Sequence, residues 1–342
     1  MILKDSSSLL ENSEEALLAK SSLHPVVLPK DRKKIIVIAG PTAVGKTHLS
    51  MQLCRALGGE VISADSVQVY NGMDIGTAKA TPLERKEIKH HLIDIKTLND
   101  SFNVMDFYME AMQAIESILR QDKVPVIVGG TGFYLHALIY GPPSGPPSVQ
   151  ELRSLIENEC ALKGVDYLFE KLRNIDPTYA NMISCHDKQK IIRGLEIIEL
   201  TGQKVSTFSL INHNAHHIYD FRCWFLNKPR DALYPIIEER CEQMLNSGLL
   251  EEINALIPLG LKKNKSASQA IGYRQGLSYL EQESNSANYH LFLQSFKAAS
   301  RQYAKRQYTW FKKEPLFRWL DVSLMPSSTV LETIIQDYEQ TL

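Results

Sequence analysis

Hydrophobic residues in the first 140 positions follow two alternating patterns. Short apolar runs rich in β-branched residues predict buried strands at Ile35–Ala39, Val61–Ala64 and Val124–Val128. Apolar residues at helical spacing predict amphipathic helices at Thr47–Leu57 and Val104–Arg120. Strands that alternate with helices predict the α/β class, with a mostly parallel sheet flanked by helices.

The pattern changes in the segment Gly141–Pro147, which reads GPPSGPP and cannot continue a strand. Ser148 and Glu151 have the spacing of a capping box, which predicts that a helix begins there. The pattern then stays helical as far as Gly202. We therefore expect an all-helical insertion at residues 142–204, within a core formed by residues 32–141 and 205–325.

The chain beyond the insertion returns to mixed patterns. Apolar runs predict strands at Cys223–Leu226 and Phe317–Leu320. Helical patterns occupy Asp231–Asn246, Leu249–Ile257 and Tyr289–Trp310. Residues 1–31 are polar and show no helical or strand periodicity of hydrophobic residues, which predicts a flexible extension.

The composition, with 44% hydrophobic and 23% charged residues and a net charge of −1, is that of a soluble globular protein. No apolar run approaches the ~20 residues that span a membrane. The acidic N-terminal segment lacks the apolar stretch of a signal peptide. Five cysteines without a C-x-x-C pair predict reduced thiols. We expect a cytoplasmic protein, and a monomer because no apolar helix face is left uncommitted.

The strongest chemical signal is the sequence GPTAVGKT between a predicted strand and a predicted helix, which fits the P-loop pattern G-x-x-x-x-G-K-[ST]. Backbone N–H groups and a helix N-terminus form an anion cradle in such a loop. Lys46 reaches the distal phosphate oxygens, and the Thr47 hydroxyl is a suitable ligand for Mg²⁺. The expected phosphate-binding residues are Gly40, Pro41, Thr42, Ala43, Val44, Gly45, Lys46 and Thr47.

Two further polar residues follow predicted strands. Asp65 follows Val61–Ala64, and Thr131 follows Val124–Val128 after two glycines. Ligands of open α/β sheets bind at the carboxyl edge, so both side chains are expected to face the phosphates. Asp65 suits either a metal or a general base. The alternative for Asp65 is an N-cap or turn residue, and for Thr131 it is a hydroxyl that only supports the turn.

A P-loop indicates phosphate binding without specifying the reaction. Seven segments between Lys34 and Leu320 indicate which reaction it is. They are GPTAVGKT, DSVQVYNGMDIGTAK, HHLIDI, VGGTGFYLHAL, DKQKIIRGLEI, AIGYRQ and RQYAKRQYTWF. In this order and spacing they resemble the bacterial tRNA dimethylallyltransferases. The resemblance implies a P-loop core with a helical insertion. It also implies transfer of the dimethylallyl group of dimethylallyl diphosphate to the N6 amine of the adenosine 3′ to the anticodon, with Mg²⁺ as cofactor.

The resemblance also implies residue roles. Asp65 is expected to be the general base, and Thr131 to contact the diphosphate. Lys46, Thr47 with Mg²⁺, and Arg230 are expected to neutralise the departing diphosphate. The alternative for Arg230 is a surface arginine at the start of a helix. The expected binding partner is the tRNA anticodon stem-loop. Eukaryotic members of the family have a C-terminal zinc finger, and this sequence has no Cys/His set that would form one.

The tRNA contacts implied by the resemblance lie in several segments. The C-terminal segment Phe296–Arg318 adds a physical argument, because it has seven basic residues, one acidic residue and interleaved aromatic rings. A solvated helix face is the alternative for this basic stripe. The expected tRNA-binding residues are Asp65, Ser66, Val67, Gln68, Thr131, Arg153, Gln189, Lys190, Ile191, Ile192, Arg193, Gly272, Tyr273, Arg274, Arg301, Lys305 and Arg306.

Three alternative functions use the same P-loop. A small-molecule or nucleoside kinase should have an arginine-rich lid, whereas the insertion has scattered charges. An RNA-binding NTPase switch, like the kinase, predicts binding of ATP or GTP. An adenylate isopentenyltransferase would keep the donor but act on free nucleotides. The basic stripe and the insertion favour an RNA acceptor.

Overall fold

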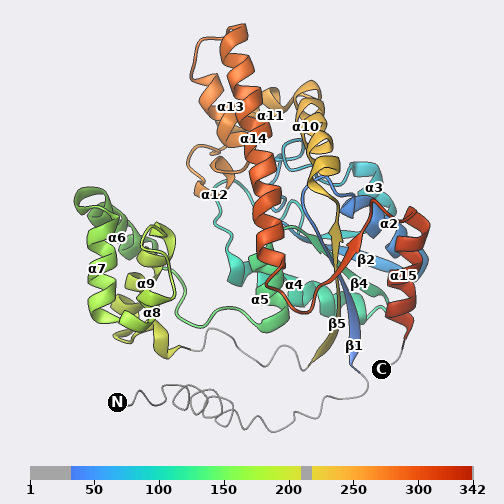
Figure 1. The fold of residues 1–342 in the computed structure, drawn as a ribbon, viewed down its shortest axis with the longest axis horizontal. Coiled ribbons are helices and arrows are strands. Elements are labelled where there is room, and N and C mark those ends of the chain that lie inside the picture. Colours follow the sequence, from blue (N-terminus) through green and yellow to red (C-terminus); the bar gives the residue numbers. More distant parts are fainter. Residues whose placement is uncertain (1–31, 209–217, 341–342) are drawn as a thin grey trace, which may run out of the picture. The chain divides into compact units, whose positions relative to one another are not determined.

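A computed structural model of the chain describes residues 32–208 and 218–340 (Figure 1). The extension expected at residues 1–31 lies outside these described residues. The described core begins with strand β1 and contains one sheet.

The sheet has six strands in the order β3-β2-β4-β1-β5-β6, and every neighbouring pair is parallel. Parallel sheets are covered on both faces, which explains why their strands read as continuous apolar runs. In β1, Ile35, Ile36, Val37 and Ile38 are all fully buried. The prediction of a mostly parallel sheet is therefore confirmed. The strands are β1 (Lys33–Ala39), β2 (Gly59–Ala64), β3 (His90–His91), β4 (Val124–Gly129), β5 (Tyr219–Asn227) and β6 (Arg318–Asp321).

Helices cover both faces of this sheet (Figure 1). The chain moves in opposite directions across the sheet from β1 to β2 and from β4 to β5. Right-handed crossovers then place the connecting helices on opposite faces. Accordingly α2 packs with α15, whereas α5 packs with α4 and α14. The core helices are α2 (Lys46–Leu57), α3 (Pro82–Glu87), α4 (Val104–Leu119), α5 (Gly132–Tyr140), α10 (Arg230–Asn246), α11 (Leu249–Leu256), α12 (Lys265–Ser268), α13 (Tyr273–Leu280), α14 (Ser286–Phe311) and α15 (Ser327–Glu339).

Most of the predicted elements are present, but strand β3 and helices α3, α5, α12, α13 and α15 were not predicted. Strand β3 has two residues, too few for a hydrophobic period. Helix α15 follows the last predicted strand, yet the sequence pattern did not predict it. Only Val330 and Ile334 among its apolar residues are fully buried, so its hydrophobic face is narrow.

The insertion contains helices and no strand among its described residues, as predicted. Its apolar side chains form a cluster separate from the main core, made by Ile156, Cys160, Leu168, Leu172, Ile191, Ile192 and Leu195. The division into residues 142–204 and two core segments stays a prediction. The helices are α6 (Gln150–Lys163), α7 (Val165–Ile175), α8 (Pro177–Asn181) and α9 (Lys188–Thr201), followed by a 3-10 turn, Val205–Thr207.

The capping box predicted at Ser148 is wrong. Helix α6 begins at Gln150 with no side-chain cap. The Ser148 hydroxyl instead donates to Glu196 Oε1 at 2.5 Å, and Val149 N donates to the same oxygen at 2.8 Å. Glu196 is fully buried and also accepts from Arg193 at 2.8 Å, so its need for donors outweighs the local cap.

Glu252 on α11 fixes the long loop that follows β2. Its Oε2 accepts from Asp74 N at 2.9 Å and from Ile75 N at 2.7 Å, and its Oε1 from Gly76 N at 3.2 Å. The Tyr273 hydroxyl donates to Oε1 at 2.6 Å. One carboxylate therefore joins the DIGTAK segment to the AIGYR segment and holds both beside the sheet.

Replacing Glu252 by leucine is expected to lower the free energy of unfolding by about 1–3 kcal/mol, because partly buried N–H donors lose their acceptor. The measurement is denaturant unfolding of the variant and the parent protein. Glu251→Leu is the matched control, because Glu251 is exposed and precedes Glu252 on the same helix. Equal stability of all three proteins would show that the loop does not depend on this carboxylate.

Candidate functional site

The P-loop joins β1 to α2 and lines a cavity of about 850 Å³ at the carboxyl edge of the sheet. Gly45 has φ 101°, a left-handed conformation that a residue with a side chain rarely adopts. At Gly40 an added Cβ would lie 2.9 Å from the Leu226 carbonyl oxygen of β5. Both glycines are thus required by backbone geometry, as the motif predicts.

Lys46 lies inside this loop, where its Nζ donates to Gly40 O at 2.9 Å and Pro41 O at 2.8 Å. Burial and the nearby charge of Arg240 lower the pKa of Lys46 to about 7, while Asp65 opposes the shift. The ammonium is therefore desolvated beside a second cation. An anion in the cavity would relieve both effects, so the site is electrostatically suited to bind one.

Arg240, in the interior of α10, is the second cation of this cavity. Its Nη1 donates to Thr42 Oγ1 at 2.6 Å, and burial lowers its pKa, with Cys241 and Asp65 acting in the opposite direction. The sequence analysis assigned this place to Arg230, which instead lines a different pocket. The missed signal is the position of Arg240 in the helical pattern, adjacent to buried Ile237 and Cys241.

Asp65 follows β2 and lines the same cavity. Its Oδ1 accepts from Val67 N at 2.9 Å and Gln68 N at 3.2 Å, so the turn role weighed for this residue is present. Within the described residues, Oδ2 has no hydrogen-bond partner. One oxygen therefore orients the carboxylate, and the other is left to accept a proton or bind a cation.

The glycines around Thr131 allow α14 to approach the end of β4. A Cβ on Gly130 would lie 2.1 Å from Gln307 Nε2, and one on Gly132 would lie 2.2 Å from the Trp310 ring. Gln307 donates to Gly130 O at 3.1 Å and accepts from Thr42 N at 3.0 Å. This buried amide links the P-loop to the GGT turn, a role the sequence analysis did not predict.

Replacing Gly130 by alanine is expected to destabilise the protein by about 1–3 kcal/mol, because overpacking displaces the Gln307 amide. Denaturant unfolding of Gly130→Ala, Gln307→Ala and the double variant measures the coupling. The double variant should be more stable than the sum of the single losses predicts. Additive losses would show that the two residues act independently.

Tyr303 on α14 places a second hydroxyl beside Thr131. Burial, with a smaller contribution from Asp65, raises the pKa of Tyr303 well above its usual value and outweighs the Thr131 hydroxyl, which lowers that pKa. The phenol therefore stays protonated at neutral pH and can act only as a neutral hydrogen-bonding group. Tyr303 lines the cavity, although the sequence analysis noted it only as one of the aromatic residues of the basic stripe.

The structure separates the expected tRNA-binding residues by exposure. Ser66, Val67, Gln68 and Arg306 line the cavity together with Asp65. The exposed side chains of the remaining set include Arg274, Gln189, Lys190 and Lys305.

Three of the expected contacts need correction. Ile191 and Ile192 are buried in the hydrophobic cluster of the insertion. Tyr273 is fully buried, with its hydroxyl on Glu252, and so supports the loop. The hydrophobic pattern of α9 contained the signal for the two isoleucines, since both lie on its apolar face. These three side chains therefore do not reach an RNA surface.

The basic stripe Phe296–Arg318 is not uniformly free. Lys297 pairs with Glu242, Arg301 with Glu238 and Arg318 with Asp337. The other four basic residues have no carboxylate partner within the described residues, and they are Lys305, Arg306, Lys312 and Lys313. Three cations of the stripe are therefore held in ion pairs, and the remaining four are available to an anionic ligand.

The sheet and the P-loop define a protein of the P-loop α/β class, with a cationic cavity whose electrostatics suit an anion. The sequence model of the IPP transferases matches residues 68–314. The chain belongs to the IPP transferase family. The resemblance found in the sequence is thereby confirmed.

Similar proteins cover most of the chain. It is 55% identical over 315 residues to a tRNA dimethylallyltransferase of Protochlamydia amoebophila, covering 92% of both chains. It is 46% identical over 310 residues to one of Chlamydia trachomatis serovar D, covering 90% of this chain and 98% of the other.

Two solved structures have the same fold. A tRNA isopentenylpyrophosphate transferase of Staphylococcus epidermidis has a TM-score of 0.65 and 34% identity, covering 90% of this chain and 99% of that one. A eukaryotic dimethylallyltransferase acting on tRNA has a TM-score of 0.69 and 30% identity, covering 84% and 74%. No helix among the described residues has the length and apolar character to cross a bilayer.

Proposed function

We propose that this protein transfers the dimethylallyl group of dimethylallyl diphosphate to the N6 amine of the adenosine 3′ to the anticodon in tRNA. The observation that carries the proposal is the cavity in which Lys46, Arg240 and Asp65 converge. Two desolvated cations suit the diphosphate, and a partly free carboxylate lies beside them. The names of the relatives support the same reaction and an acceptor that is tRNA.

The reaction forms a bond between N6 and the first carbon of the prenyl group, and breaks the bond from that carbon to the diphosphate oxygen. Asp65 receives the proton that N6 loses. Negative charge grows on the departing diphosphate, so Lys46 and Arg240 stabilise the transition state more than the bound substrate. An amine conjugated to an aromatic ring is a weak nucleophile, which gives the carboxylate a defined task.

Mg²⁺ remains part of the proposal. No cluster of three or more His, Cys, Asp or Glu side chains suited to a metal occurs in residues 32–208 and 218–340. Mg²⁺ is commonly held by few protein oxygens together with substrate phosphates. The Thr47 hydroxyl at the start of α2 fits that donor set, and the Asp65 carboxylate lines the same cavity. When bound, the ion would neutralise phosphate charge.

The acceptor base must leave its stack to reach the cavity, and this costs least in an unpaired anticodon loop. Gln68 and Arg306 line the cavity together with Asp65, where they can contact a flipped nucleotide. We place the protein in the cytoplasm, where tRNA is its substrate, and expect a monomer.

The proposal is tested by incubating the purified chain with radiolabelled dimethylallyl diphosphate, Mg²⁺ and unmodified tRNA, and in parallel with AMP. Label in tRNA and not in AMP supports the proposed acceptor. Label in AMP would place the chain among enzymes that prenylate free nucleotides. Consumption of ATP with no transfer of label would support the kinase or NTPase alternatives.

A further inference from the structure

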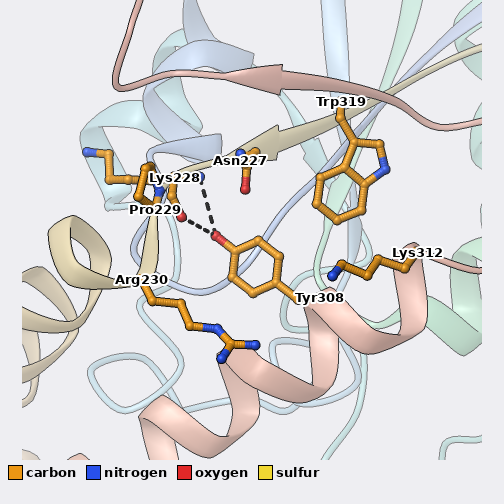
Figure 2. Close-up of a pocket in the computed structure, with 7 residues that line it drawn as sticks. All are labelled: Asn227, Lys228, Pro229, Arg230, Tyr308, Lys312 and Trp319. Carbon is orange, nitrogen blue, oxygen red and sulfur yellow. Dashed lines mark hydrogen bonds between the residues drawn. The ribbon is translucent and has the colours of Figure 1, made fainter.

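A second pocket, which we call the β5 pocket, lies where β5 ends and α10 begins (Figure 2). Its volume is about 380 Å³. Parts of four segments meet here: the end of β5, the start of α10, the C-terminal part of α14, and β6. The residues that line it include Asn227, Lys228, Arg230, Tyr308, Lys312 and Trp319.

The walls of this pocket are fixed by contacts that need no ligand. The Tyr308 hydroxyl donates to Lys228 O at 2.6 Å and accepts from Lys228 N at 3.3 Å. The Trp319 ring lies 4.2 Å from the Phe225 ring, centroid to centroid, and the residue is 38% exposed. An aromatic wall with part of an indole surface open to a ligand is therefore already formed.

The charges of the pocket are unbalanced. Lys228, Arg230 and Lys312 have no carboxylate partner within the described residues, although Lys297, Arg301 and Arg318 of the nearby stripe do. In Figure 2 the Arg230 and Lys312 side chains approach the Tyr308 ring from two different helices. Such convergence of unpaired cations in a cavity indicates an anionic ligand.

The acidic groups nearby do not cancel this charge. Asp321 already accepts from Asn227 Nδ2 at 3.3 Å, from Ser323 N at 2.9 Å and from Ser323 Oγ at 2.5 Å. Asp231 lies in the first turn of α10, where the helix N-terminus stabilises a carboxylate. Neither Asp231 nor Asp321 lines the β5 pocket, whereas Arg230 and Lys312 do.

We propose that the β5 pocket binds a phosphate group of a nucleotide, with Arg230 and Lys312 on the phosphate and Trp319 against the base. The combination of cations with an exposed aromatic ring is the one that nucleic-acid chains require. The nucleotide belongs to the bound tRNA, and this assignment of the source rests on the proposed function.

The placement of the pocket favours a polymer over a single nucleotide. Lys305, which is also unpaired, lies two turns before Lys312 on the same side of α14. Arg230 and Arg240 are ten residues apart on α10, so the pocket and the reaction cavity are separated by about 15 Å along this helix. One RNA strand can therefore contact both. A free nucleotide offers the same phosphate and base, and the experiment separates the two sources.

The test uses the full chain and the variants Arg230→Ala and Lys312→Ala. Binding of unmodified tRNA is measured as a function of salt concentration. Each variant is expected to reduce the slope of log Kobs against log salt by about 1, as expected for loss of one phosphate contact. The KM for tRNA should rise several-fold, while kcat and the KM for dimethylallyl diphosphate stay unchanged. Arg230→Lys should retain most of the slope.

The matched control is Lys33→Ala, at the amino end of β1 and outside both cavities. Equilibrium dialysis of AMP against parent and Arg230→Ala proteins tests the free nucleotide. A loss of AMP binding with an unchanged tRNA slope would support the nucleotide site and assign it to free nucleotides.

Two results would overturn the proposal. One is an unchanged salt slope in both variants together with unchanged AMP binding in Arg230→Ala. The other is a lower kcat and a higher KM for dimethylallyl diphosphate in Arg230→Ala, which would return Arg230 to the diphosphate role predicted from the sequence. Absence of prenyl transfer in the parent protein would instead contradict the proposed function, and the AMP measurement would still test the pocket.

Discussion

Replacing Asp65 by asparagine is expected to lower kcat for prenyl transfer to tRNA by about 100- to 10,000-fold, the usual contribution of a general base. The physical reason is that an amide has no basic oxygen to receive the N6 proton. The asparagine side-chain oxygen can still accept from Val67 N and Gln68 N, the bonds that Asp65 Oδ1 makes. The loop should therefore keep its conformation, and single-turnover kinetics at saturating substrates measure the effect.

The control for this prediction is Asp100→Asn. Asp100 is an exposed carboxylate that accepts from Thr97 N at 2.8 Å and does not line the cavity. Both variants should unfold at the temperature of the parent protein to within a few degrees. If Asp65→Asn keeps the parental kcat, Asp65 is a turn residue only, and a different group must accept the proton.

The sheet and its helices follow from the sequence because burial on both faces produces continuous apolar runs. The strands β1, β2, β4 and β5 have such runs, and the P-loop pattern identifies the connection after the first. Helix α15 was not predicted, because few of its residues are buried. The buried helix α5 was not predicted either, because it is apolar over most of its surface and so lacks the polar face that reveals a helical period. Hydrophobic pattern thus specifies the strands better than the short helices.

The residues of the candidate site likewise fall into those that the sequence predicted and those that it did not. Lys46 and Asp65 could be predicted because each follows a strand at the edge of the sheet where ligands bind. Gln307 and Tyr303 could not, because they come from a helix more than 170 residues beyond Gly130 in the chain. Their positions depend on the packing of α14 against the end of β4, which a local pattern does not contain.

Arg240 illustrates the difference between resemblance and geometry. Arg230 and Arg240 lie on the same helix, and the resemblance alone led to Arg230, although the apolar pattern around Arg240 indicated a buried face. Ten residues correspond to about 1000° of rotation at 3.6 residues per turn, so the two side chains leave the helix in different directions. Only the packing of α10 on α14 decides that Arg240 enters the P-loop cavity.

Replacing Arg240 by alanine is expected to lower kcat by about 100- to 1,000-fold, the usual effect of removing one preorganised donor from a developing negative charge. The lost group is buried and donates to Thr42 Oγ1 at 2.6 Å, so the P-loop would also lose a contact that fixes its conformation. Affinity for inorganic diphosphate should fall together with kcat, since the same cation holds the product. Isothermal titration with diphosphate and single-turnover transfer give the two quantities separately.

Arg240→Lys and Arg120→Ala complete this experiment. The lysine variant should recover part of the rate, because it restores charge without the planar fork of the guanidinium. Arg120 is an exposed residue at the end of α4 that pairs with Glu116, and its loss should leave both quantities unchanged. If Arg240→Ala binds diphosphate as tightly as the parent protein, the cation acts on the conformation of the P-loop alone. Among the cations described, Lys46 would then be left to neutralise the charge on the leaving group without Arg240.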